Sequence, residues 1–588
     1  MLKHDEPDYK RVALAVFLAA VLLVGWQAKV EWPRRQALAK MNAENLQENA
    51  KGHATHTETL APKTAADTDE NASLTREQRI AASPRIAIDS GTLKGSIALK
   101  GARFDDMSLV KYRETLESDS PAVTLLSPGG DDKSYFIQIG WVATDGKTKV
   151  PDQHSLWTAD KKQLKQGESI TLRWDNGEGV TFLMSIALNH DYLFDINQQV
   201  ENHSGHEINL SPYAYINRFY EQPKQAPFLH EGPLGVMDGT LNEATYKTIK
   251  EKGDKTFDDT SGWFGITDKY WLTALIPATA HEKITYSHDI KKDKDRYQVD
   301  YLAAPQTIAD GTKNENALRL FTGAKELKML DQYTTGNTTP PMQPIPLFDR
   351  SLDFGYFYFL AKPMCTVVDW LYSETGNFGV ALLIFIIIVK ALMFPVANKS
   401  YKSMSQMRKL QPEITKIRER YHDDQIGLHK ATRELYKREK VNPAAGCLPV
   451  LIQIVVFLAL FRGLNVSIEM RHAPFYGWIK DLSAADPSNL FTAFGLVNWP
   501  APTWLHLGLL PILYCITMII QTRQQPKPAD PVQAKMMTYM PFMMLLFFDK
   551  MASGFVLYWT WSNIISILQQ RFISSRNIEP PLAREFGL

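Results

Sequence analysis

The sequence predicts a polytopic α-helical membrane protein with six transmembrane helices and a large exported β-sandwich domain. Two observations predict this class. Long apolar runs are concentrated in about the last 200 of the 588 residues, although the mean hydropathy of the whole chain is mildly negative. Before them lie many short runs of β-branched and aromatic residues, separated by Gly, Asp and Asn, which is typical of antiparallel strands. The formal net charge of +1 hides an uneven distribution of charge along the chain.

The N-terminal segment "YKRVALAVFLAAVLLVGWQ" predicts a membrane anchor. Lys10 and Arg11 precede the apolar run, and no A-x-A-like cleavage site follows it. We therefore expect a cytoplasmic N-terminus at 1–11 and an uncleaved signal-anchor helix at 12–28, with the following residues exported. Residues 29–84 are rich in Ala, Asn, Glu, Thr and Lys and poor in aromatic residues. That composition predicts a flexible linker.

Residues 85–347 predict a large β-sandwich, through runs such as "SYFIQIGWVAT", "SITLRW" and "RYQVDYLAA". We find no catalytic constellation in it. "GWVATDGKT" is not a phosphate-binding loop, because five residues separate Gly140 from Gly146 where that motif needs four. "HSGH" at 203–206 lies in a Ser/Gly turn and indicates a solvated loop. We predict no enzymatic activity, no metal and no cofactor. The three cysteines have neither disulfide-framework nor CxxC spacing.

Residues 351–375 predict an amphipathic helix at the membrane interface, because Trp and Tyr favour that region. Five further spans are expected at 378–397, 444–464, 504–520, 534–548 and 555–568. The loop at 398–440 holds 12 Lys/Arg and 6 Asp/Glu, whereas 467–503 holds only Arg471 and Lys480 as basic residues. The basic loops are therefore expected in the cytoplasm, with both termini on that side.

The basic segment 398–442 predicts a cytoplasmic helical hairpin. Met404, Met407, Leu410, Ile414, Ile417 and Tyr421 recur every three or four residues, and Asp423 or Asp424 can begin a second helix. A solvated hairpin with no special role is one interpretation. The other is a contact surface for anionic lipids, ribosomal RNA or a nascent chain. The basic candidates are Arg408, Lys409, Lys416, Arg418, Arg420, Lys437 and Arg438.

Lys390 lies within the apolar run "GVALLIFIIIVKALMFP". A lysine at the centre of a lipid-facing helix costs roughly 2.5–3.5 kcal/mol on insertion scales. Polar residues in other spans offer a way to avoid that cost, because together with Lys390 they can line one wet cavity. Singly, each is more often a helix-packing residue. The candidates for the cavity are Gln453, Thr538, Tyr558, Ser562 and Asn563.

Three strings, "KVNPAAGCLPVLIQIVVFLALF", "RHAPFYGWIKDLSAADP" and "SGFVLYWTWSNIISILQQ", resemble the YidC-type membrane protein insertases (the YidC/Oxa/Alb family) of Gram-negative inner membranes. The resemblance extends to the whole plan of the chain. It implies a five-helix insertase core at 376–573, a cytoplasmic tail at 574–588 and a periplasmic β-sandwich. Lys390 takes the place of the positive residue in a hydrophilic groove open to cytoplasm and lipid.

The resemblance also implies how the protein works and with what. Nascent membrane proteins would be inserted and chaperoned, alone or with the Sec translocon, by a monomer that needs no nucleotide. Anionic phospholipids and, less directly, the ribosome are further implied partners. The apolar segment of a new chain would slide along Val455, Val456, Phe457, Leu460, Val556 and Leu557.

The sequence departs from the family pattern in three places. Arginine is usual where Lys390 stands, and Ile386 replaces a polar residue common one helical turn earlier. The tail "RNIEPPLAREFGL" is short and mixed in charge, which argues against ribosome docking through it. The basic hairpin is the better candidate.

Two other functions compete with an insertase. A secondary transporter would use Lys390 for anion or proton coupling, but transporters typically show repeated halves and broken helices, and no internal repeat is evident. A membrane-anchored carbohydrate enzyme would need a carboxylate or histidine constellation, and it leaves the five spans unexplained.

Overall fold

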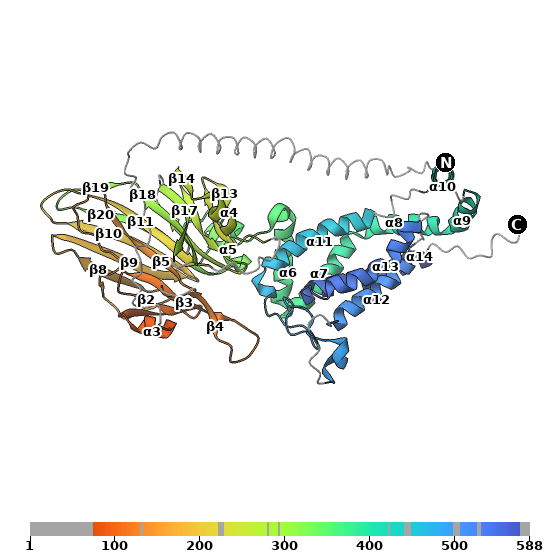
Figure 1. Cartoon of the computed structure of the whole chain (residues 1–588), viewed down its shortest axis with the longest axis horizontal. Helices are drawn as coiled ribbons and strands as arrows, with labels where there is room; N and C mark the ends of the chain where they lie inside the picture. The colour runs from red at the N-terminus through yellow and green to blue at the C-terminus, as the bar shows by residue number, and fades with distance from the viewer. Residues whose placement is uncertain are drawn as a thin grey trace. The chain divides into compact units, whose positions relative to one another are not determined.

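The computed structural model describes residues 74–129, 133–220, 229–278, 282–291, 294–421, 424–439, 441, 448–497, 502, 506–525 and 531–576 (Figure 1). The predicted cytoplasmic N-terminus, the signal anchor and most of the linker lie outside these residues, as does most of the predicted tail at 574–588.

The end of the predicted linker is a helix, α3 (Arg76–Ala81). Thr75 caps it, since the threonine hydroxyl accepts from the Gln78 amide and the Gln78 side chain accepts from the Thr75 amide. Arg76 also forms an ion pair with Asp106. The prediction of a linker as far as residue 84 is therefore wrong for these residues, because a local capping box is invisible to a composition argument.

The β-rich region consists of two sheets within the described residues (Figure 1). The larger has the path β14 (Lys255–Thr260), β17 (Glu282–Lys291), β18 (Lys294–Ala303), β11 (Ile208–Phe219), β5 (Tyr135–Ala143), β3 (Arg103–Arg113), β2 (Leu93–Ala98), β1 (Arg85–Asp89) and β7 (Gln163–Lys165), with β19 (Gln306–Ile308) beside β11 and β4 (Ala122–Leu126) beside β3. The smaller runs β13 (Thr240–Glu243), β12 (Gly232–Met237), β15 (Gly262–Thr267), β16 (Trp271–Pro277), β20 (Lys313–Ala324), β10 (Leu193–Asn202), β9 (Val180–His190), β8 (Ser169–Asp175) and β6 (Thr158–Ala159).

The two sheets share one apolar core. Along β9, buried side chains alternate with less buried ones, as expected when one face of a strand is packed. Rings from opposite sheets meet in the core: the centroids of Phe104 on β3 and Phe194 on β10 are 5.6 Å apart, and those of Trp141 and Phe182 are 5.1 Å apart. The prediction of a β-rich domain is confirmed. Two short helices, α4 (Tyr246–Lys252) and α5 (Leu327–Thr335), accompany the strands.

The C-terminal part of the chain is helical. Two 3₁₀ turns (Phe348–Ser351 and Gly355–Phe357) lead into α6 (Tyr358–Thr375), so the regular helix starts later than the predicted residue 351. The remaining α-helices are α7 (Phe378–Leu392), α8 (Phe394–Lys409), α9 (Gln411–Arg420), α10 (Gln425–Arg438), α11 (Leu448–Val466), α12 (Leu509–Arg523), α13 (Pro531–Phe548) and α14 (Ser553–Arg576). Helix α14 contacts α7, α8 and α12, and α6 contacts α7 and α11.

The predicted span at 378–397 is not one straight helix. It breaks at Met393, and α7 and α8 are bent by 66°. Pro395 in the first turn of α8 lacks the amide that would continue the hydrogen-bond ladder of α7. Among the described residues, no single helix is both long and apolar enough to cross a bilayer, whereas α7 and α8 pass that test together. Shorter apolar stretches occur at 451–466, 509–523 and 534–548.

The basic segment contains the expected hairpin with one more break than predicted. Its first arm is divided between α8 and α9 at Leu410, two residues before Pro412. Asp424 begins the second arm, because its carboxylate accepts from the Gly427 amide at 2.8 Å. Ile414 and Leu435 are buried, and Met404, Met407 and Val441 form a small apolar cluster.

Candidate functional site

Lys390 lies in the last turn of α7, where three helices meet. Its ammonium donates to the Gln453 side-chain oxygen of α11 at 3.1 Å and to the Ser566 hydroxyl of α14 at 2.9 Å. The lysine is half-buried. Both partners are neutral, and in the described residues Lys390 forms no ion pair. The bonds solvate the charge without neutralising it.

Gln453 connects the lysine to a second polar group. Its amide nitrogen donates to the Tyr558 hydroxyl, so Lys390, Gln453 and Tyr558 form a continuous chain across α7, α11 and α14. Gln453 and Tyr558 are both buried. Buried polar side chains are stable in such surroundings when they are hydrogen-bonded, as they are here.

One face of α14 supplies most of the site. Tyr558, Ser562, Ser566 and Gln569 recur at intervals of three or four residues, which places them on the same side of a helix. Gln569 donates to the backbone oxygen of Lys390 at 3.3 Å, close to the break between α7 and α8. Helix α14 thus contacts both the side chain and the backbone of Lys390.

A second polar contact joins α14 to α12. The Asn563 amide donates to the Thr517 hydroxyl oxygen at 3.2 Å, and the Thr517 hydroxyl donates to the Tyr514 carbonyl at 2.7 Å. Asn563 therefore lies on a different face of α14 from the Lys390 network. Its contact fits the helix-packing role that the sequence left open.

The predicted cavity residues are only partly brought together. Gln453 bonds Lys390 directly, and Tyr558 joins the network through Gln453. Ser562 is buried on the same face of α14. Thr538 is exposed on α13, and its hydroxyl donates to the Ala534 carbonyl of its own helix at 2.9 Å. Thr538 is therefore not part of the network. A polar residue in a membrane span can lie on the outside of the helix bundle, as Thr538 does.

Ser566 and Gln569 were missed by the sequence reasoning, although a signal existed. Both continue the spacing that begins at Tyr558 and Ser562. The helical spacing along 553–576 therefore places them on the same face as Tyr558 and Ser562.

The helices around the site carry no carboxylate. Helices α7, α11, α12, α13 and α14 contain no Asp or Glu. Their other basic residues, like Lys390 itself, lie toward helix ends: Arg462, Arg523, Lys535, Arg571 and Arg576. Among the described residues, Lys390 is the charged group in the polar network formed with Gln453, Ser566 and Tyr558.

The predicted sliding surface is exposed only on α11. Val455 is 43% exposed, and Val456 and Phe457 are half-buried, but Leu460, Val556 and Leu557 are buried. The prediction of an outward position is wrong for those three, because Val556 and Leu557 begin α14 inside the apolar core. The exposed apolar side chains on α11 and α13 are instead Leu451, Ile454, Val455, Leu458, Met536, Tyr539, Phe542, Met543, Leu546 and Phe547.

The basic hairpin residues lie on its surface. Arg408, Lys409, Lys416, Arg420, Lys437 and Arg438 are exposed, and Arg418 is half-buried. Arg408 donates to the backbone oxygen of Arg523 at 3.2 Å, which connects the hairpin to the end of α12. Arg438 pairs with Glu413 and with Glu439, each at 3.0 Å.

Buried carboxylates tie the opposite end of the helices together. Asp486 accepts from the Leu510 amide at 2.7 Å and from the Trp478 ring nitrogen at 3.0 Å. Asp549 accepts from the Gly508 amide at 2.8 Å and contacts His506 at 3.1 Å. These bonds satisfy amides at the start of α12, a place where carboxylates are favourable.

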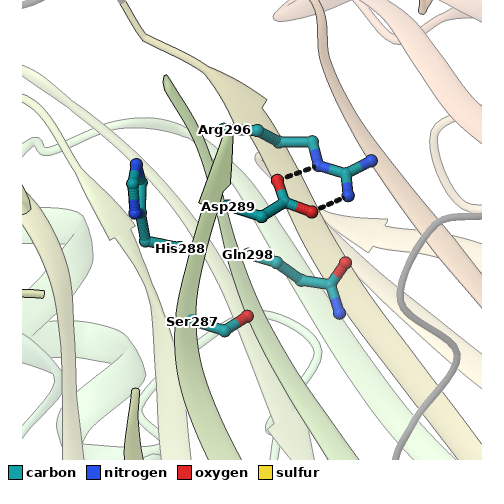
Figure 2. A pocket seen from close by; sticks show the side chains of 5 residues that line it. All are labelled: Ser287, His288, Asp289, Arg296 and Gln298. Atoms are coloured by element: carbon teal, nitrogen blue, oxygen red, sulfur yellow. Dashed lines mark hydrogen bonds and ion pairs between the residues drawn. The ribbon is translucent and has the colours of Figure 1, made fainter. Parts of the chain in front are cut away.

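The β-rich domain offers weaker candidates. A small cavity on β17 and β18 is lined by Ser287, Asp289, Arg296 and Gln298, with His288 pointing away from the ion pair of Asp289 and Arg296 (Figure 2). Its volume of about 10 Å³ holds at most a water molecule. A cleft of about 450 Å³ lies between β9, β10, β20 and residues 340–343. No group of three or more potential metal ligands occurs among the described residues.

Two family models match the chain, one for the YidC periplasmic domain at residues 85–367 and one for the 60Kd inner membrane protein at 370–580. The chain is 42% identical to the membrane protein insertase YidC of Rickettsia bellii over 563 residues, covering 95% of this chain and 98% of that protein. It is 41% identical to the same-named protein of Rickettsia conorii over 570 residues, covering 96% and 98%.

Solved structures give more distant likenesses. A crystal structure of an active YidC insertase is 15% identical with a TM-score of 0.34, covering 83% of this chain and 92% of that one. A galactose mutarotase related enzyme from Lactobacillus acidophilus is 10% identical with a TM-score of 0.28, covering 40% of this chain and 97% of that one. The sequence relatives, not these structures, carry the assignment.

Proposed function

The chain belongs to the YidC family of membrane protein insertases, and we propose that it inserts and chaperones inner-membrane proteins through the polar site around Lys390. The observation that carries this proposal is the hydrogen bonding of Lys390 to neutral side chains in helices that contain no carboxylate. A charge that is bound only to neutral groups can still attract an acidic side chain of a substrate.

The physical task of an insertase is to lower the cost of moving a polar segment past lipid. Unpaired backbone and charged groups in hydrocarbon cost several kcal/mol each. Hydroxyl and amide groups of Tyr558, Gln453 and Ser566 can replace water around such a segment. The Lys390 ammonium attracts acidic side chains, and its neutral partners leave it free to release them.

The apolar segment of a new chain needs a different surface. We assign this contact to the exposed apolar side chains of α11 and α13, with Val455 retained from the predicted set. Four methionines of α13 add adaptability, because a thioether side chain packs against many apolar shapes. They are Met536, Met540, Met543 and Met544.

The membrane arrangement belongs to the same proposal. Six spans, with both termini in the cytoplasm and the β-rich domain in the periplasm, agree with the basic loops at 398–440 and 521–535. The bent α7–α8 pair would begin in the bilayer and leave it at the basic hairpin. The exposed cations of that hairpin suit anionic lipid heads and ribosomal RNA. A monomer acting alone or beside the Sec translocon completes the proposal.

A coupled transporter is less well supported by the same helices. Proton or ion coupling in membranes generally uses carboxylates or histidines that pair with one another. Helices α7, α11, α12, α13 and α14 contain neither residue type. One lysine bound to an amide and a hydroxyl is a poor coupling site.

The test is depletion of the protein in cells, followed by measurement of membrane integration of short-tailed single-span and hairpin proteins. We expect integration to fail, and a photo-reactive residue in place of Val455 to crosslink the apolar segment of the substrate. The same residue in place of the buried Leu557 is the matched control and should give little crosslinking. Normal integration without crosslinks at Val455 would contradict the proposal.

A further inference from the structure

We propose that the turn at 490–497 inserts its apolar side chains into the outer leaflet of the membrane and anchors the start of α12 there. This inference rests on the proposed membrane arrangement, in which α12 is a span. The turn contains a 3₁₀ segment, Leu490–Gly495. The side chains that project from it are exposed: Leu490 and Phe491 at 43%, Phe494 at 46%, Val497 at 53% and Leu496 at 89%.

The chemistry of the segment suits lipid better than water. Residues 487–522 contain no Asp, Glu, Lys or Arg. A surface loop in water usually consists of polar and charged residues, whereas a contiguous exposed apolar patch marks a contact with a partner or a membrane. A protein interface usually surrounds its apolar centre with a polar rim, and residues 487–522 supply no charged side chain for such a rim.

The backbone holds the aromatic side chain outward at a cost. Ala493 and Phe494 both have positive φ, at 47° and 58°, which is a region that residues other than glycine rarely occupy. Such conformations persist only where the surroundings enforce them. The Phe494 amide donates to the Asn489 carbonyl at 2.9 Å, and the Val497 amide donates to the Thr492 carbonyl at 3.0 Å. The turn is therefore a built structure, and it exposes Phe494.

The turn is fixed to the residues that lead into α12. The Asn489 side chain accepts from the Phe491 amide at 3.1 Å and from the Leu507 amide at 3.3 Å, and the Leu490 amide donates to the Leu507 carbonyl at 2.9 Å. Three residues before Asn489, Asp486 accepts from the Leu510 amide. A position of α12 in the bilayer thus fixes the position of the turn.

The neighbouring surface of α12 indicates which partner the turn contacts. Leu513, Ile516 and Ile520 of α12 are exposed and apolar, so the proposed span presents them to lipid. The turn precedes this surface at the N-terminal end of α12, which is the level of headgroups and first acyl carbons. Side chains such as Phe and Leu bind at that boundary by burying apolar area. We therefore commit to phospholipid as the occupant.

The experiment uses the full chain in vesicles of phosphatidylethanolamine and phosphatidylglycerol. A photo-reactive phenylalanine analogue replaces Phe494, and after irradiation the phospholipid adduct is measured by mass spectrometry. Ile516 is the position expected to face lipid, and Leu156, a 58% exposed apolar residue of the β-rich domain, is the control expected to face water. We expect several-fold more adduct at Phe494 than at Leu156, approaching the yield at Ile516.

The outcomes separate this inference from the proposed arrangement. Adduct at Ile516 with none above the Leu156 level at Phe494 would overturn the anchor and leave the span intact. No adduct at either Phe494 or Ile516 would overturn both. Adducts of Phe494 with a co-purified or added protein, in place of lipid, would show that the patch is a protein interface and would also overturn the inference.

Discussion

The Lys390 ammonium lies 2.9 Å from the Ser566 hydroxyl, which connects the end of α7 to the middle of α14. The same ammonium bonds Gln453 on α11, so one charge joins three helices through neutral groups. Hydrogen bonds to a charged group contribute more than neutral ones, roughly 1.5–3 kcal/mol. The contact is therefore a structural connection as well as a binding feature, and substitutions must separate these two roles.

Replacing Lys390 tests whether the charge matters. We expect Lys390→Arg to be tolerated, because a guanidinium keeps the charge and can reach the same oxygens. Lys390→Ala should reduce insertion several-fold for substrates with acidic tails and less for neutral ones. The measurement is protease protection of the substrates in membranes, with Ile387→Ala, an exposed position on the same helix, as the control. An equal loss for both substrate classes would indicate that hydration of the site, and not its charge, is what counts.

Gln453→Glu tests whether neutral partners keep the charge available. Glutamate places a carboxylate where the amide oxygen now lies, 3.1 Å from the ammonium, and opposite charges this close attract each other strongly where water is scarce. We expect the fold to persist, and insertion of acidic-tailed substrates to fall toward the level of Lys390→Ala. Gln453→Met, which removes the bond without adding a charge, is the comparison. If the glutamate variant inserts these substrates normally, Lys390 does not act as a free charge.

Gly463→Ala tests the packing of α6 against α11. A Cβ at residue 463 would lie 2.2 Å from the Cys365 sulfur, far inside contact distance. Overpacking of this kind costs about 1–3 kcal/mol. The variant should therefore unfold at a lower temperature in detergent, and Cys365→Ala should restore much of the loss by removing the sulfur. A double variant no more stable than Gly463→Ala alone would show that another contact is limiting.

The sequence was a good guide to element types and a poor one to helix ends and facing directions. Apolar and alternating runs predicted the β-rich and helical parts because burial follows those patterns. Composition did not reveal α3, since its capping box involves only Thr75 and Gln78. The break at Met393 was not predicted, because a proline can either kink a helix or break it, and the sequence does not show which Pro395 does.

For the site as well, the residue types could be predicted but the directions in which they face could not. Lys390, Gln453 and Tyr558 could be predicted because polar residues in apolar helices are conspicuous. Which of them meet depends on helix rotation, and sequence alone does not fix that rotation. Thr538 faces outward and Ser566 faces inward for this reason. Leu557 is as apolar as Val455, so only packing reveals that the first is buried and the second exposed.

The buried Lys325 should make stability depend on pH. Burial lowers its pKa from 10.5 to about 8, although neighbouring carboxylates such as Asp268 and Asp353 oppose the shift. Between these two values the unfolded state binds more protons than the folded state, so this group makes folding more favourable as pH rises. We expect Lys325→Met to remove part of the increase in melting temperature over that interval. The wild-type and variant curves should differ in slope, not merely in height, when unfolding is followed from pH 7 to 10.5.

Charge removal from the hairpin tests whether unpaired cations contact an anionic partner. Lys437 and Arg438 are exposed neighbours on α10, and within the described part of the hairpin only Arg438 forms ion pairs, with Glu413 and Glu439. Each substitution by glutamine removes one positive charge, so the two variants are matched in net charge. A contact with ribosomal RNA depends on cations that can reach a phosphate and weakens with salt.

We expect Lys437→Gln to reduce co-sedimentation of the nanodisc-embedded protein with ribosomes and to flatten its salt dependence. Arg438→Gln should do so less, because its guanidinium is already occupied. Equal effects would show that only the net charge matters, and no effect of either would remove the hairpin as a ribosome contact.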